Sequence, residues 1–361
     1  MNHEQHMQIA LSLAREGLGL TRPNPPVGAI VCRGASVLGK GTHRRAGGPH
    51  AEVAALQQSG RRARGSTLYV TLEPCSTQGR TGACTDLILA AGIRRVVVAV
   101  TDPNPDHAGR GLRLLRRHGV DVVCGICRAD GEALIAPFHR WMTTKRPYVT
   151  LKLGLSLDGF LADAARRSQW ITGPASRREV QAMRRCVDAI MVGIETVRAD
   201  DPSLTPRPRK GREPLRVVVD SRGRIPLGST VLNDSRVGAT VVATTDACPQ
   251  RRAAAIRKKG AQVIRCRASK GGVSMPSLLA ALGRLDVLHV LCEGGGDLAG
   301  TLIRRGLVDE YALFVAPILL GGGVSVAGSQ AWALGVAPKL LITETVRVGD
   351  DLLLRAVPKR N

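Results

Sequence analysis

Three short elements in the first quarter of the chain constrain its fold and chemistry more than any other feature. They are His50-Ala51-Glu52, Pro74-Cys75 and Cys84. One imidazole and two thiolates can hold a zinc ion and leave its fourth position open, which is the arrangement of a catalytic rather than a structural zinc. Glu52, two residues after the imidazole, is placed to move protons without binding the metal. The simpler alternative is a scattered histidine with two buried thiols, because free cysteine packs well as a small apolar residue.

The surrounding sequence predicts that these elements meet at one end of a strand. Ser66–Thr71 is rich in β-formers and predicts a strand that ends just before Glu73-Pro74-Cys75. His50 begins a predicted helix through Gln58, and Cys84 begins another through Ala91, each with a glycine close behind its end. Both helix N-termini would face the metal, where their dipoles favour thiolate over thiol.

An H-x-E followed by a later P-C and a further cysteine is characteristic of zinc-dependent base deaminases. In this chemistry zinc lowers the pKa of a bound water toward neutrality. Glu52 takes the proton, hydroxide attacks the amidine carbon, and Glu52 returns a proton to the departing ammonia. The pattern therefore predicts His50, Cys75 and Cys84 as zinc ligands and Glu52 as a catalytic residue.

At 361 residues the chain exceeds the usual size of a single core, so we expect two domains. An odd number of cysteines, nine, and a predicted amphipathic helix over Met1–Leu20 in place of a hydrophobic signal segment favour a reducing, cytoplasmic compartment. The longest apolar stretch, Tyr311–Gly328, is interrupted by Pro317 and three consecutive glycines. It predicts a buried strand followed by a loop rather than a membrane span.

The basic excess, 52 Lys and Arg against 29 Asp and Glu, raises the question of nucleic-acid binding. The excess is spread along the chain, with 20 basic and 10 acidic residues in 1–146 and 32 and 19 in the remainder. Single-strand binding also relies on stacked aromatic side chains, and the chain has only three each of Phe, Trp and Tyr. We expect no nucleic-acid or membrane partner and interpret the charge as suited to phosphorylated small molecules and nucleotides.

Cys124-Gly125-Ile126-Cys127 leaves three interpretations open. A C-x-x-C serves as a redox pair or as half of a zinc site, but this one follows the mostly apolar run Val120–Val123, and no second pair lies at zinc-ribbon spacing. The third interpretation, two incidental thiols at the end of a strand, is favoured.

Alternation of helices and strands predicts an α/β fold. In the first half, strands at Val27–Cys32, Ser66–Thr71, Arg95–Val100 and one ending near Val123 alternate with helices, which indicates a mixed sheet between helices. The pattern weakens from Asp130 to Arg146, and Lys145-Arg146-Pro147 marks a boundary between domains 1–146 and 147–361. The strands predicted in the second half are Tyr148–Leu153, Pro214–Asp220, Thr240–Thr244, Leu288–Leu291 and Tyr311–Val315.

A glycine cluster stands between a predicted strand and a predicted helix in Glu293-Gly294-Gly295-Gly296-Asp297-Leu298-Ala299. There, backbone N–H groups can close on a phosphate with help from the helix dipole. Three glycines also serve in simple turns, so both interpretations stay open. The cluster is not G-x-G-x-x-G, and a standard Rossmann domain is not supported.

Further motifs occur in order along the chain. In the first half they are Thr21-Arg22-Pro23-Asn24-Pro25-Pro26-Val27-Gly28, Gly41-Thr42-His43, Gly47, His50-Ala51-Glu52, Leu72-Glu73-Pro74-Cys75, Gly79-Arg80-Thr81, Cys84-Thr85-Asp86 and Asp102-Pro103-Asn104-Pro105. In the second half they are Lys152, Ser156-Leu157-Asp158-Gly159, Ser168-Gln169-Trp170-Ile171-Thr172, Asp188-Ala189-Ile190, Thr196, Ala199-Asp200-Asp201-Pro202, Glu293-Gly294-Gly295 and Asp309-Glu310. With these motifs the chain resembles the bifunctional deaminase–reductases of riboflavin biosynthesis over essentially its full length.

The resemblance implies a cytidine-deaminase-like three-layer domain followed by a dihydrofolate-reductase-like domain. The first would use Zn²⁺ to deaminate a diaminopyrimidinone that carries a ribosylamino 5′-phosphate. The second would use NADPH to reduce the ribosyl group to ribityl. The expected partner is this phosphorylated pyrimidine, and we also expect a homo-oligomer, although the sequence does not give the number of subunits.

The resemblance also implies residue roles. Contacts to NADP would come from Gly154, Trp170, Thr196, Asp200, Ser221 and the loop Gly295, Gly296, Asp297, Leu298, Ala299, Gly300 and Thr301. Substrate contacts would come from Asn24, Ser168, Arg184, Leu204, Arg207 and Glu293. Arg184 and Arg207 suit a substrate phosphate, because a guanidinium makes paired hydrogen bonds to phosphate oxygens. Asp200 is the candidate acid for the reduction, although Asp201-Pro202 beside it is equally a helix stop.

The chain departs from the family pattern between the two cysteine ligands. Thr77 stands where the family usually has histidine, and Gly82-Ala83 stands where it has Pro-Pro. These departures motivate one alternative, a reductase whose first domain is only a scaffold. A second alternative, a nucleic-acid or tRNA-editing deaminase, predicts C-x-x-C spacing of the ligands, a localised basic patch and no second half, and the sequence meets none of these.

Overall fold

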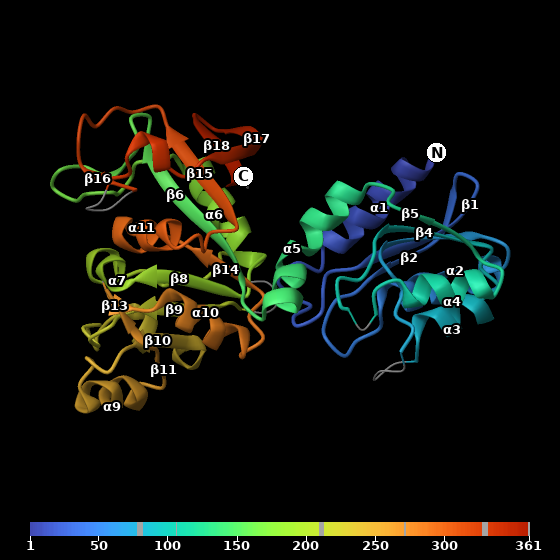
Figure 1. Cartoon of the computed structure of the whole chain (residues 1–361), viewed down its shortest axis with the longest axis horizontal. Coiled ribbons are helices and arrows are strands. Elements are labelled where there is room, and N and C mark those ends of the chain that lie inside the picture. Colours follow the sequence, from blue (N-terminus) through green and yellow to red (C-terminus); the bar gives the residue numbers. More distant parts are fainter. Residues whose placement is uncertain (78–81, 106, 209–212, 271, 327–330, 360–361) are drawn as a thin grey trace. The chain divides into compact units, whose positions relative to one another are not determined.

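The structure, a computed structural model, describes the chain except residues 78–81, 106, 209–212, 271, 327–330 and 360–361 (Figure 1). It divides into two compact units. Unit 1 spans Met1–Lys145 and unit 2 spans Arg146–Asn361. Within the described residues, no helix combines the length and the apolar character needed to cross a membrane.

Unit 1 is a five-stranded mixed sheet between helices. Its helices are α1 (His3–Arg15), α2 (Ala51–Ser59), α3 (Cys84–Ala90), α4 (Arg110–Arg117), α5 (Arg128–Thr144) and the 3-10 helix η1 (Gly60–Ala63). Its strands are β1 (Gly28–Arg33), β2 (Ser36–Thr42), β3 (Thr67–Leu72), β4 (Arg95–Val100) and β5 (Asp121–Cys124). The strand order is β2-β1-β3-β4-β5, with β3, β4 and β5 parallel and β1 antiparallel to both neighbours.

Each face of this sheet has its own apolar core, because successive side chains of a strand point to opposite faces. On β1, Val31 packs with α2, α3 and α4 on one face, whereas Ile30 packs with α1 and α5 on the other. Figure 1 shows the two helical layers on either side of the sheet. Unit 1 therefore has three layers, as the sequence predicts.

Glycines set the distance between helices and sheet in unit 1. A Cβ placed on Gly41 of β2 would lie 1.9 Å from the carbonyl oxygen of Ala51 in α2. A Cβ on Gly28 of β1 would lie 2.0 Å from the carbonyl oxygen of Ala10 in α1. The helix backbones thus rest directly on the strands, which brings the start of α2, and with it His50, close to the sheet.

Unit 2 is built on a nine-stranded sheet in the order β11-β10-β9-β8-β14-β6-β15-β18-β17. Its strands are β6 (Tyr148–Ser156), β8 (Ala189–Gly193), β9 (Leu215–Val219), β10 (Thr240–Thr244), β11 (Gln262–Arg265), β14 (His289–Cys292), β15 (Glu310–Ala316), β17 (Leu340–Val348) and β18 (Asp351–Pro358). Two small two-stranded sheets pair β7 (Phe160–Ala162) with β16 (Val324–Ser325) and β12 (Ala268–Ser269) with β13 (Gly272–Val273). All strands of the large sheet from β11 to β15 run parallel, and β18 and β17 add an antiparallel edge.

Helices cover both faces of this sheet. They are α6 (Pro174–Arg185), α7 (Ile194–Asp200), α8 (Thr230–Asn233), α9 (Gln250–Lys258), α10 (Met275–Gly283) and α11 (Gly296–Arg304), with 3-10 helices η2 (Val237–Ala239) and η3 (Leu334–Val336). Residues of α10 and α11 join one apolar core, and residues of α6, α7, α8 and α9 join the other. The carboxyl ends of the parallel strands meet at one edge of the sheet, where α/β proteins bind ligands.

The predicted elements agree with the structure at the strands and helices that carry the motifs. The predicted helix His50–Gln58 is α2 with His50 as its N-cap, and the predicted strand Arg95–Val100 is β4. The helix predicted over Met1–Leu20 is too long, because α1 ends at Arg15, shortly before Gly17 and Gly19. Residues 128–144, where the sequence pattern weakens, form the 17-residue helix α5, although Pro137 lies inside it.

Replacing Gly41 with alanine should destabilise unit 1, because the added methyl group overlaps the α2 backbone. We expect a loss of about 2 kcal/mol or more in the free energy of unfolding, as for other overpacked cores. Urea unfolding of the full zinc-loaded chain measures it. Gly82→Ala is the control, since a Cβ there meets nothing within 4 Å. Equal stability of the two variants would show that α2 does not rest on β2 as described.

Candidate active sites

The three predicted zinc ligands of unit 1 lie together. His50 caps α2, Cys75 follows the end of β3, and Cys84 is the first residue of α3. The His50 Nδ1 atom lies 3.2 Å from Cys84 Sγ and 3.6 Å from Cys75 Sγ, and all three ligand atoms lie within 4.8 Å of one another. Ligands of a tetrahedral zinc at ordinary bond lengths are separated by about 3.5 Å. The donor set and its spacing therefore fit a zinc ion with three protein ligands.

The environment of these sulfur atoms favours a thiolate. A hydrogen bond between the two thiols lowers the pKa of Cys75 to about 4 and raises that of Cys84. The backbone N–H of Cys84, at the start of α3, also donates to Cys75 Sγ at 3.4 Å. Thiolate is the form of cysteine that binds metal, so this environment favours the binding of a metal cation by the two cysteines.

Glu52 lies in the first turn of α2 and is 4% exposed. Burial raises the pKa of its carboxyl group. A carboxyl that is buried beside the metal ligands and holds a proton more tightly than usual suits the transfer of protons to and from a reacting group.

The structure adds His43 to this site, a residue that the sequence analysis named only within a motif. His43 is 2% exposed, and burial lowers its pKa, which favours the neutral ring. Its Nδ1 lies 2.9 Å from the Pro49 carbonyl oxygen, and its Nε2 lies 3.1 Å from Asn24 Nδ2. With Nδ1 donating to Pro49, Nε2 accepts from the Asn24 amide and fixes the orientation of this predicted substrate contact.

Glu73 anchors the end of β3 to the start of α4. Its Oε2 accepts from the backbone N–H of Gly109 at 2.8 Å and of Asp102 at 3.2 Å, and its Oε1 accepts from that of Gly111 at 2.9 Å. Its carboxylate is buried, with 5% of the residue exposed. Since Glu73 precedes Pro74 and Cys75, this network fixes α4 relative to a zinc ligand.

Cys124 and Cys127 lie apart from the metal ligands. Cys124 ends β5, and Cys127 stands just before α5 with a φ of 54°. In the described part of the chain, His50, Cys75 and Cys84 are the one group of three or more His, Cys, Asp or Glu side chains close enough to share a metal ion. The motif segment Gly79-Arg80-Thr81 lies outside the described residues.

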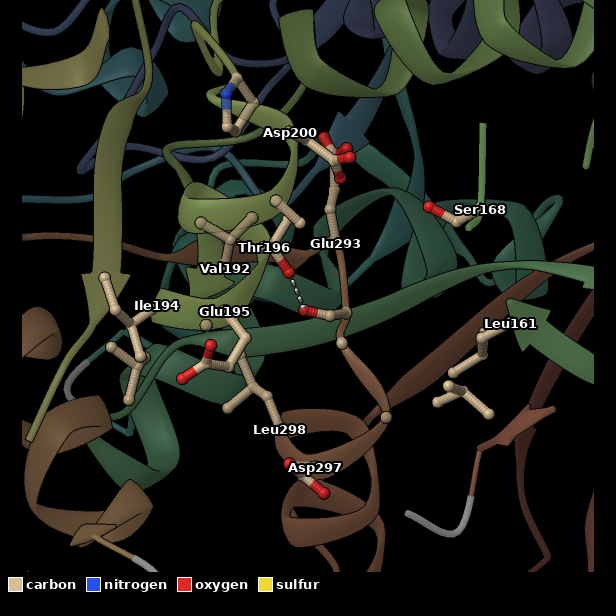
Figure 2. Close-up of a pocket in the computed structure, with 18 of the residues that line it drawn as sticks. Leu161, Ser168, Val192, Ile194, Glu195, Thr196, Asp200, Glu293, Asp297 and Leu298 are labelled. Carbon is tan, nitrogen blue, oxygen red and sulfur yellow. Dashed lines mark hydrogen bonds between the residues drawn. The ribbon is translucent and has the colours of Figure 1, made fainter. Parts of the chain in front are cut away.

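The predicted reductase residues surround a cavity of about 1880 Å³ in unit 2, at the carboxyl edge of the parallel strands (Figure 2). Those that line it are Gly154, Ser168, Trp170, Arg184, Thr196, Asp200, Leu204, Arg207, Ser221, Glu293, Gly295, Gly296, Asp297, Leu298 and Thr301. Ala299 and Gly300, which are buried in α11, do not line it.

Arg184 and Glu293, which both line the cavity, form an ion pair. Arg184 Nε and Nη2 donate to the two carboxylate oxygens at 2.5 and 2.7 Å, and the side chains are 14% and 9% exposed. Burial opposes ionisation of Glu293, but the charge and hydrogen bonds of Arg184, with Lys152 nearby, outweigh it and lower the pKa. Burial also lowers the pKa of Lys152, which lines the same cavity and has no predicted role.

The glycine cluster forms the turn that opens α11. Gly294 and Gly295 have φ values of 57° and 99°, in a region of backbone conformation that residues with a side chain rarely adopt. The hydroxyl of Thr196, in α7, donates to the Gly294 carbonyl oxygen at 3.5 Å, as Figure 2 shows. The turn therefore places the N-terminus of α11 at the cavity, which is a suitable position for a phosphate.

The remaining predicted residues lie around the cavity with few fixed partners. Asp200 is exposed at the end of α7 and accepts from Gln169 Nε2 at 2.9 Å. Trp170 is 67% exposed, and the Arg177 guanidinium lies 4.5 Å from its ring. Asp201, with a φ of 39°, is the C-cap residue that follows α7. The Arg207 guanidinium contacts Ser203 Oγ at 3.4 Å.

Comparison with known proteins matches both units. Residues 1–100 match the cytidine and deoxycytidylate deaminase zinc-binding region, and residues 147–354 match the RibD C-terminal domain. The chain is 40% identical to the riboflavin biosynthesis protein RibD of Escherichia coli over 99% of this chain and 100% of that protein. It is 38% identical to that of Aquifex aeolicus over 97% of each.

Solved structures agree over the same length. Acinetobacter baumannii RibD matches with a TM-score of 0.88 at 36% identity and covers 99% of each chain. A Thermotoga maritima protein, described as a diaminohydroxyphosphoribosylaminopyrimidine deaminase/5-amino-6-(5-phosphoribosylamino)uracil reductase, matches with a TM-score of 0.85 at 33% identity. It covers 99% of this chain and 98% of that one.

Removal of one ligand should empty the zinc site. We expect Cys84→Ser to reduce bound zinc from about one ion per chain to near zero, because two remaining ligands leave a tetrahedral site incomplete. Elemental analysis of the purified, dialysed protein measures it. Cys124→Ser, in the same unit, should keep its zinc. If zinc falls in Cys124→Ser instead, the C-x-x-C segment is the metal site.

Proposed function

The chain belongs to the RibD family of bifunctional riboflavin-biosynthesis deaminase–reductases, and on that basis we propose its substrate, cofactors and residue roles. The substrate is 2,5-diamino-6-(5-phosphoribosylamino)pyrimidin-4(3H)-one, which is deaminated by unit 1 and then reduced with NADPH by unit 2 to 5-amino-6-(5-phosphoribitylamino)uracil. Similarity over both units favours two activities over the alternative of a reductase with a scaffold domain.

The observation that carries the deaminase proposal is the grouping of His50, Cys75 and Cys84 beside buried Glu52. These three residues would hold a zinc ion, which when bound would lower the pKa of the nucleophilic water. Glu52 accepts a proton from that water and delivers it to the departing amino group, which leaves as ammonia. Neutral His43 holds the Asn24 amide in place, and Asn24 contacts the pyrimidine.

The reductase proposal rests on the cavity of unit 2. Its lining residues would hold NADPH, whose chemistry when bound would be the supply of hydride to the sugar carbon of the ring-opened substrate. The turn at Gly295 and the start of α11 hold the cofactor's phosphates, while Trp170 and Ser221 line the space beside them. Asp200, exposed at the cavity, donates the proton that accompanies the hydride.

Arg184 and Arg207 are both predicted to bind the substrate phosphate, but the ion pair of Arg184 with Glu293 indicates different roles for them. Arg184 commits two donors to Glu293, so its position is fixed and only its remaining N–H groups are free for substrate. Among the residues that the structure describes, the Arg207 side chain makes one weak contact, with Ser203 Oγ at 3.4 Å. We therefore assign the substrate phosphate in the reductase site mainly to Arg207, and the positioning of the sugar to Arg184 with Glu293.

Glu52→Gln should separate the two activities. The amide cannot transfer protons, so we expect ammonia release to fall by about 100-fold or more. NADPH oxidation with the deaminated intermediate as substrate should keep its wild-type rate, because that reaction belongs to unit 2. Product masses with and without NADPH identify each step. Loss of both activities in this variant would contradict two separate sites.

Gly295→Ala should weaken NADPH binding. The alanine would adopt an unfavourable φ of 99°, and its Cβ would lie 3.3 Å from Thr196 Oγ1 at the cavity. We expect KM for NADPH to rise about tenfold, equivalent to about 1.4 kcal/mol. Gly306→Ala is the matched control, because Gly306 also has a positive φ of 59° but lies beyond the other end of α11, with open space around it. An equal effect of both changes on KM would contradict the proposed phosphate site.

A further inference from the structure

A second cavity, of about 360 Å³, lies in unit 1 and is lined mainly by arginines. Its lining residues are Ser76, Arg110, Arg113, Leu114 and Arg117. The three arginines all belong to α4, at positions i, i+3 and i+7, and therefore share one face of the helix. All three are exposed. We call them the arginine row.

Like charges three and four residues apart on a helix repel one another, so the arginine row costs stability unless an anion is present. Within the part of unit 1 that the structure describes, no carboxylate forms an ion pair with any of the three. Arg116, on the same helix, is different. Its guanidinium points to the neighbouring strand, where it donates to the Val122 carbonyl oxygen at 3.4 Å and approaches Cys124 Sγ at 3.8 Å.

The arginine row is fixed close to the zinc ligands. Ser76, which lines the cavity, directly follows the ligand Cys75. The buried carboxylate of Glu73 binds the backbone N–H groups of Gly109 and Gly111, on either side of Arg110. A Cβ on Gly111 would lie 2.2 Å from the Pro74 carbonyl oxygen, so the α4 backbone also rests on the segment that leads to Cys75.

The same contacts limit which groups can bind an anion here. The N–H groups of Gly109 and Gly111 at the start of α4 are already occupied by Glu73, so the helix end itself offers little to a ligand. The charged donors available in the cavity are guanidinium groups, which bind phosphate oxygens with paired hydrogen bonds. The Ser76 hydroxyl supplies a further donor.

We propose that the arginine row binds the 5′-phosphate of the pyrimidine substrate while its ring is deaminated at the zinc site. This inference rests on the proposed function, which gives the substrate a phosphate at the far end of its sugar from the reacting ring. The substrate would then be held at both ends, with its phosphate at α4 and its pyrimidine ring beside Cys75 and Glu52. Contacts at both ends would fix the position of the amidine carbon at the zinc site. The site would therefore select the phosphorylated compound over its free nucleoside-like form.

The test compares two substrates in the full zinc-loaded chain. Deamination is measured for the phosphorylated pyrimidine and for the same compound after its phosphate is removed. In the wild type the ratio of the two kcat/KM values should strongly favour the phosphorylated compound. In the double variant Arg113→Ala/Arg117→Ala this ratio should fall about tenfold or more, through KM, because two charge-assisted contacts are lost.

Arg116→Ala is the matched control and should keep the wild-type ratio. Inorganic phosphate is the probe for the subsite itself: it should inhibit wild-type deamination competitively and inhibit the double variant much less. Bound zinc, measured by elemental analysis, verifies that unit 1 of each variant is folded.

Several results would overturn the inference. One is an unchanged ratio in the double variant, and another is an equal loss in Arg116→Ala, which would indicate general electrostatics. Equal inhibition of all variants by inorganic phosphate would place the phosphate elsewhere. A wild type that releases no ammonia from either compound would instead contradict the proposed function of unit 1.

Discussion

Parallel hydrogen bonding brings strand ends together, and both sites depend on it. In unit 1, β3 and β4 run parallel, so Glu73 after one strand can bind the backbone at Asp102 after the other. In unit 2, the parallel strands β6, β14, β8 and β9 end at one edge. Gly154, Glu293, Thr196 and Ser221, far apart in sequence, therefore line one cavity.

Buried carboxylates then fix the parts of each site in place. Glu73 accepts three backbone N–H groups and joins two strand ends to α4. Glu293 is joined to Arg184 by two hydrogen bonds, and the pair links the end of β14 to α6. A buried carboxylate without such partners would destabilise the folded protein, so each carboxylate favours the local arrangement that supplies its partners. The two carboxylates differ in their hydrogen-bond donors. Glu73 accepts from backbone N–H groups, whereas Glu293 accepts from the Arg184 side chain, which also lines the cavity.

The sequence predicted the residues whose chemistry is local. His50, Glu52, Cys75 and Cys84 are recognisable because metal ligation needs given residue types at given spacings, and the flanking strand and helices follow from short-range patterns. His43 was not assigned a role, because its orientation depends on Pro49 and Asn24, which the fold brings to it. Helix α5 was missed because only Gly131, Leu134 and Ile135 are buried in it, too few for a clear amphipathic pattern. The pairing of Arg184 with Glu293 spans 109 positions and has no local signal.

The contacts at the two ends of the segment from Cys75 to Cys84 also bear on its unusual sequence. The N–H of Thr85 donates to the Cys75 carbonyl oxygen at 3.2 Å, and the N–H of Cys84 donates to Cys75 Sγ. Two backbone N–H groups at the start of α3 therefore hold Cys75 beside Cys84. Both contacts are made with Gly82-Ala83 immediately before Cys84, so the metal geometry does not require the rigid Pro-Pro pair at these two positions.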